Sequence, residues 1–102
     1  MATVSAFHDG FPTPNAEVTF DNGERVSLML ERGGLTIKNV ASSAMLYRTD
    51  SGTVAKLCAA LANSRAPLEA SPLKLLVTVV AQMHSAADVA GAFTAAGAAV
   101  EA

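Results

Sequence analysis

The chain has 102 residues, of which 51% are hydrophobic, and its 7 basic and 9 acidic side chains leave a net charge of -2. This length allows one domain with one modest core. The basic residues are scattered along the chain, which argues against nucleic-acid binding, and the apolar stretches are far shorter than the roughly 20 residues of a membrane span.

The N-terminal part, residues 1–15, is the least regular. Pro12 and Pro14 block the hydrogen bonds of a helix or of a central strand. Residues 3–7 permit a short edge strand, and an irregular arm is the alternative. We therefore expect a single α+β domain over residues 16–102, preceded by this arm or edge strand.

Apolar and polar residues alternate on both sides of an Asp-Asn-Gly turn within residues 16–31, which predicts a β-hairpin. A three-residue loop at 21–23 sets Val18 opposite Val26, whereas a two-residue loop would pair apolar with polar positions. The longer loop also places Gly23 at the left-handed position of a type I turn with a G1 bulge. We therefore predict the three-residue loop.

Gly33 and Gly34 predict a second, two-residue turn, which would bring Leu30 opposite Ile37. Two further strands follow, separated by a short turn. The expected strands after the first hairpin occupy residues 35–40 and 44–48. Together with the hairpin they make an antiparallel meander of three to four strands with one apolar face.

A helix is expected next, because Asp50 or Ser51 can cap it and apolar residues follow at helical spacing. The helix is expected to stop near residues 63–65, before the first of two prolines. The apolar stripe consists of Val54, Leu57, Cys58 and Leu61.

Residues 73–80 fit two interpretations. Ser71 and Pro72 form the N-cap and N1 pattern of a helix, and the following apolar residues fit a helix face. Residues 77–80, however, are all β-branched, which favours a strand. We predict a buried strand here, with a helix as the alternative.

A C-terminal helix over residues 86–98 is predicted by the capping-box spacing of Ser85 and Asp88 and by the apolar stripe that follows. Gly91 lies in mid-helix, where glycine costs about 1 kcal/mol relative to alanine. We therefore expect a close-packing reason for Gly91.

Alanine and glycine occupy almost every side of this helix, and a helix surface of small side chains allows a partner to approach closely. The charged fraction of the chain is only 16%, below the roughly 25% of typical soluble domains. Both features favour self-association or a protein partner. The predicted interaction face consists of Ala87, Gly91, Ala95 and Ala98.

The sequence offers no strong candidate for catalysis, a cofactor or a metal. His8, His84 and Cys58 do not form a ligand-spaced pair. Cys58 lies on the apolar stripe of its helix, where a free cysteine behaves as a small hydrophobe. A single cysteine also excludes an internal disulfide framework and favours a cytoplasmic protein.

These features favour a small, non-enzymatic protein-interaction or assembly module that self-associates, and we expect neither nucleic acid nor membrane as a partner. Two alternatives stay open. The first is a small-molecule-binding protein or small enzyme with a pocket between sheet and helices, for which Tyr47, Arg48 and His84 are candidate residues. The second is an inhibitor or accessory subunit of a larger complex.

Overall fold

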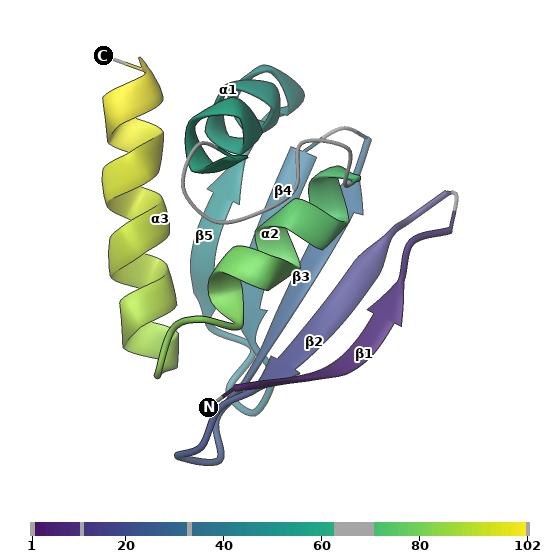
Figure 1. The fold of residues 1–102 in the computed structure, drawn as a ribbon, viewed down its shortest axis with the longest axis vertical. Coiled ribbons are helices and arrows are strands. Elements are labelled where there is room, and N and C mark those ends of the chain that lie inside the picture. The colour runs from purple at the N-terminus through teal and green to yellow at the C-terminus, as the bar shows by residue number, and fades with distance from the viewer. Residues whose placement is uncertain (1, 11, 33, 63–70, 102) are drawn as a thin grey trace.

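The computed structural model describes residues 2–10, 12–32, 34–62 and 71–101. Within these residues the chain forms a five-stranded antiparallel sheet and three helices (Figure 1). The elements are β1 (Thr3–His8), β2 (Asn15–Thr19), β3 (Arg25–Glu31), β4 (Gly34–Asn39), β5 (Met45–Thr49), α1 (Ser51–Ala62), α2 (Pro72–Val80) and α3 (Ala86–Glu101). The strands lie in the order β1-β2-β3-β4-β5, so the predicted α+β class and antiparallel meander are confirmed.

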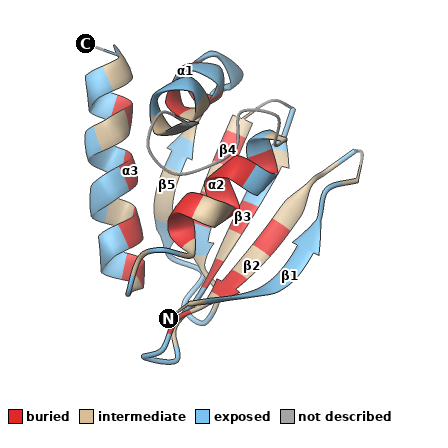
Figure 2. Ribbon diagram, viewed as in Figure 1, coloured by how far each residue is buried: buried red, intermediate tan, exposed pale blue. Residues whose placement is uncertain are grey.

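The three helices lie on one face of the sheet (Figure 1). Helix α2 packs over β2 and β3, α1 over β4, and α3 beside β5. Each strand from β2 to β4 turns alternate apolar residues toward the helices, where they are buried (red in Figure 2). These buried strand residues are Ala16, Val18, Val26, Leu28, Leu35 and Ile37. We call this side of the sheet the helix face and the opposite side the open face.

The first hairpin has the predicted register. Val18 lies opposite Val26, and Ala16 lies opposite Leu28. Gly23 has a φ of 89°, a left-handed conformation that costs glycine little. The three-residue loop therefore forms because it matches apolar pairs along both strands and places a glycine where the turn needs one.

The predicted register of the second hairpin is wrong. Leu30 lies opposite Leu35, not opposite Ile37. In the predicted register Leu35 would have faced Arg32 at the turn and Leu28 would have faced Asn39, whereas the observed one pairs Leu35 with Leu30 and Ile37 with Leu28. Arg32 consequently adopts a φ of 53°, so the pairing of apolar residues along the strands prevails over the local cost of a left-handed non-glycine residue.

The predicted strand over residues 73–80 is also wrong, because this segment forms helix α2. The Ser71 hydroxyl accepts a hydrogen bond from the Lys74 N–H at 3.2 Å, and Pro72 occupies the first turn. The cap and the burial of apolar residues against the sheet outweigh the β propensity of the last four residues. The buried residues of α2 are Leu73, Leu75, Leu76, Val77, Val79 and Val80.

Helix α1 is capped by Asp50, whose Oδ1 accepts a hydrogen bond from the Thr53 N–H at 2.9 Å. Its predicted end near residues 63–65 lies outside the described residues. In the first turn of α1, the Thr53 hydroxyl donates a hydrogen bond to Glu101 Oε1 at 2.9 Å. This contact ties the start of α1 to the end of α3.

Helix α3 begins at the predicted residue but extends to Glu101 instead of ending at residue 98. Ser85 Oγ accepts a hydrogen bond from the Asp88 N–H at 3.2 Å. Asp88 Oδ2 in turn accepts from the His84 N–H at 3.3 Å. The two side chains therefore cap the helix reciprocally, with the second bond shifted to His84.

The close-packing role expected for Gly91 belongs to Gly97. No atom lies within 4 Å of the position that a Cβ at Gly91 would take. At Gly97, by contrast, an added Cβ would overlap the hydroxyl of Tyr47, and it would lie 3.1 Å from that ring's Cζ. Gly97 is therefore the residue that lets α3 approach β5.

Candidate functional site

The three residues predicted for a pocket between sheet and helices lie in separate places. Tyr47 is half-buried on the helix face, with its ring centroid 5.7 Å from that of Phe93. Arg48, its neighbour on β5, is exposed. His84 is exposed in the connection between α2 and α3. The structure does not bring these residues together.

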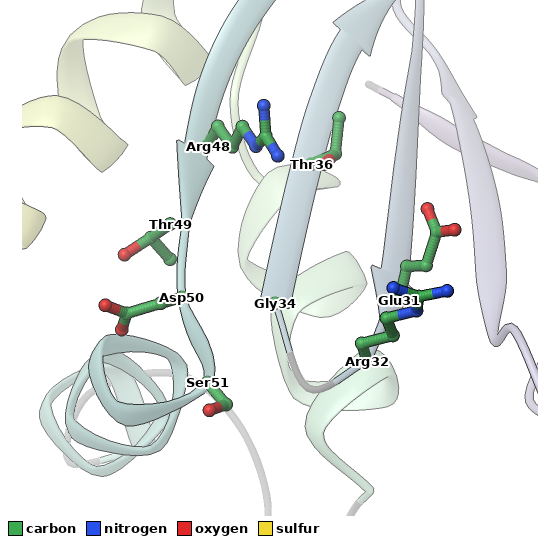
Figure 3. Close-up of a pocket in the computed structure, with 8 residues that line it drawn as sticks. All are labelled: Glu31, Arg32, Gly34, Thr36, Arg48, Thr49, Asp50 and Ser51. Atoms are coloured by element: carbon green, nitrogen blue, oxygen red, sulfur yellow. The ribbon is translucent and has the colours of Figure 1, made fainter.

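Arg48 lines a polar pocket of about 590 Å³ where the β3–β4 turn meets the start of α1 (Figure 3). Arg48 reaches over β4 toward Thr36. Asp50 turns toward α1 instead, where the Thr53 N–H hydrogen bond lowers the pKa of its carboxyl. Of the two acidic residues that line this pocket, Glu31 and Asp50, the second thus already serves as a helix cap, and we assign the pocket no ligand.

Cys58 is half-buried among the helices, and burial raises the pKa of its thiol. A raised pKa keeps the thiol neutral at physiological pH, and the neutral thiol is a poor nucleophile and a poor metal ligand. Across the described residues, no group of three or more His, Cys, Asp or Glu side chains is placed to hold a metal ion.

The predicted interaction face of α3 is exposed at every position. Ala87, Gly91, Ala95 and Ala98 are all exposed, and helical spacing puts them on the side opposite the buried residues of α3. Figure 2 shows the exposed stretches of this helix in pale blue. Each presents little apolar area, because alanine and glycine have small side chains or none. A helix also leaves few backbone groups for a partner to bond, since its own turns satisfy them.

A second candidate surface lies at the opposite edge of the sheet, on β1. This strand ends the sheet, so the N–H and C=O groups along its outer side face no other described strand. All six of its residues are exposed, and it contains no Asp, Glu, Lys or Arg. Charged residues are a common protection of edge strands against pairing, and β1 has none.

Two large apolar side chains of β1 point to the helix face. Val4 lies opposite Val18 and Phe7 opposite Ala16, and both partners are buried on that face. Val4 and Phe7 nevertheless remain 41% and 42% exposed, because α2 packs mainly over β2 and β3 and covers β1 only in part.

An apolar groove of about 610 Å³ separates β1 from α2. Val4 and Ala2 line one side, and Ala81 and Met83 are among the residues on the other. Farther along the strand, the Lys74 ammonium lies 5.4 Å from the centre of the Phe7 ring. We call the outer side of β1 together with Val4 and Phe7 the β1 edge.

Sequence reasoning allowed a short edge strand at residues 3–7, but it placed the interaction face on α3 and assigned no site residue to this strand. The signal was present, since the sequence TVSAFH combines β-branched and aromatic residues with a lack of charge. The exposure of apolar side chains at such an edge cannot be read from the segment alone, because it depends on which strand pairs with it and on how far the helices extend.

Comparison of the chain with protein-family models, curated proteins and solved structures found no match. None of the helices in the described part of the chain is long and apolar enough to cross a membrane. The function is therefore inferred from the surfaces described above.

Proposed function

We propose that the chain is a small protein-interaction module that self-associates through the β1 edge. The observation that carries this proposal is the combination of an uncharged outer strand with two large, exposed apolar side chains, Val4 and Phe7. A partner strand would both bond the outer backbone groups and cover these side chains. The partner proposed is a second copy of the chain, not nucleic acid.

The β1 edge is preferred to the outward face of α3 on two grounds. A strand edge offers backbone hydrogen-bond donors and acceptors, which β-augmentation uses for affinity. Valine and phenylalanine also remove more apolar area from water than alanine or glycine can. The α3 face remains a prediction, and the same experiment tests it.

The expected association is weak. One six-residue strand with two large side chains is a small contact compared with a standard interface, which buries about 800 Å² on each partner. Small interfaces of this kind belong to transient complexes. We therefore expect a concentration-dependent dimer with a dissociation constant in the micromolar range.

Sedimentation velocity from low to high micromolar concentration tests the proposal, with Val4→Lys as the disrupting variant. Lysine on an edge strand opposes pairing, and the exposure of Val4 lets the folded chain accommodate it. Ala95→Lys introduces the same charge on the outward face of α3 as a matched control. We expect a dimer for the unmodified chain and for Ala95→Lys, and a monomer for Val4→Lys.

Two results would contradict the proposal. A monomer at every concentration for the unmodified chain would exclude self-association. Loss of the dimer in Ala95→Lys but not in Val4→Lys would transfer the interface to α3. Thermal unfolding of each variant shows whether the folded state is retained, so that loss of the dimer is not mistaken for loss of the fold.

We further propose that the protein acts in the cytoplasm. The support is Cys58, the single cysteine of the chain, because an unpaired thiol is typical of a reducing compartment.

A further inference from the structure

We infer that two copies join their β1 strands antiparallel about a two-fold axis, with Val4 of each copy opposite Phe7 of the other. This inference rests on the self-association proposed above and specifies its geometry. The evidence is the bulge in β1, the faces to which the β1 side chains point, and the charges around the strand.

A two-fold axis that relates antiparallel strands of one sheet runs perpendicular to the sheet. Each residue therefore keeps its face, and the two helix layers lie on the same side of the joined sheet. Paired residues must then share a face. In a regular strand, residues three positions apart such as Val4 and Phe7 point to opposite faces, and they could not pair in this way.

The bulge between Val4 and Ala6 removes this obstacle. It inserts one extra residue, so that Val4 and Phe7 both point to the helix face. The inserted stretch points to the open face. Ser5 Oγ lies 2.9 Å from the hydroxyl of Thr19 there, and Ala6 lies opposite Glu17.

The full strand is then self-complementary in one register. With Val4 opposite Phe7, Thr3 falls opposite His8 and Ser5 opposite Ala6, and every pair shares a face. A register with Val4 opposite Val4 pairs only residues 3–5, and one with Phe7 opposite Phe7 pairs only residues 6–8. The remaining registers of two or more pairs set a helix-face residue against an open-face residue.

The chemistry of this register is favourable. A β-branched residue directly across from an aromatic one is a stabilising cross-strand pair, and the two-fold axis makes this pair twice. No like charges oppose each other, because β1 has no Asp, Glu, Lys or Arg. The nearest acid on β2, Glu17, is paired with Arg25 at 3.5 Å.

Disulfide trapping in the full chain tests the register. Cys58→Ser removes the native thiol from every sample. Val4→Cys and Phe7→Cys are then prepared separately, and they are oxidised mildly alone and as an equimolar mixture. We expect a linked dimer in the mixture and little or none in either variant alone.

A second pair keeps both apolar side chains intact. Thr3→Cys and His8→Cys lie on the open face at the two ends of the strand, and the same register sets them opposite each other. We again expect a linked dimer only in the mixture. Cys58→Ser without any added cysteine is the control for folding and for dimerisation, which sedimentation measures without oxidant.

The possible failures are distinguishable. A linked dimer from Val4→Cys alone, or from Phe7→Cys alone, overturns the register and leaves self-association standing. A control that dimerises while no mixture becomes linked overturns the β1 pairing and locates the interface elsewhere. A control and an unmodified chain that stay monomeric overturn the proposed function itself.

Discussion

The two glycines of α3 provide a matched pair for testing how this helix packs. Gly91 is exposed, and a Cβ added there would meet no atom within 4 Å. Gly97 is buried, and a Cβ added there would overlap the Tyr47 hydroxyl. Alanine substitution therefore makes the same chemical change in the same helix, in two different surroundings.

The expected effects have opposite signs. Alanine in place of glycine within a helix gains about 1 kcal/mol at either position. At Gly91 this gain is expected in full. At Gly97 the methyl group must displace the Tyr47 ring, which packs against Phe93 at a centroid distance of 5.7 Å. Overpacking of this kind costs about 1–3 kcal/mol, so we expect a net loss of about 1 kcal/mol.

Urea denaturation followed by circular dichroism measures the change in the free energy of unfolding for both variants. In a thermal melt, a change of about 1 kcal/mol corresponds to roughly 4–8 °C in Tm for a domain of this size. Tyr47→Phe removes the nearest atom, so it is expected to recover part of the loss in Gly97→Ala, and a double-mutant cycle measures that coupling. If both alanine variants were stabilised equally, α3 would not be seated on β5 through Gly97.

Three further outcomes are expected. Ser71→Ala should lower the free energy of unfolding by about 1 kcal/mol, because α2 loses its N-cap, and Ser71→Asp should restore most of it in urea melts. Hydrogen bonding lowers the pKa of Asp50 below its ordinary 3.8. The ionised Asp50 carboxyl therefore contributes fully to the free energy of unfolding above pH 3.8, and this contribution is lost as the pH falls from 3.8 through the lowered pKa. Asp50→Asn should therefore flatten the acid limb of stability against pH, and an unchanged limb would contradict this cap. The raised pKa of Cys58 predicts slower alkylation by iodoacetamide at pH near 8 than for a small free thiol, and an equal rate would show that burial does not protect it.

The two hairpins show how far the sequence determines register. At the first, the glycine position and the match of apolar residues select the same loop, and the observed pairing of Val18 with Val26 agrees. At the second, two adjacent glycines suggested a turn whose register matches Leu30 with Ile37 but leaves Leu28 opposite Asn39. Leu35 pairs with Leu30 instead, since the match along the whole strand stabilises the sheet more than a glycine stabilises one turn.

Helix α2 shows where local preference stops being informative. Its β-branched residues favour a strand when considered alone, yet Ser71 caps a helix that buries them against β2 and β3. Burial in the core stabilises such an apolar segment whether it forms a strand or a helix. The N-cap and the proline after it were the more specific signal, because they satisfy helix geometry directly.

The candidate site illustrates a stronger limit. Composition located a candidate interface on α3, because the small residues of that helix are visible in the sequence. Whether a strand forms an open edge with exposed apolar side chains depends instead on the assembled sheet and its helices. The exposure of Val4 and Phe7 depends on α2 packing mainly over β2 and β3 and leaving much of β1 uncovered. Their common face depends on a bulge opposite Glu17. Neither condition is local to residues 3–8, so the self-complementarity of β1 emerges only when pairing, bulge and helix cover are considered together.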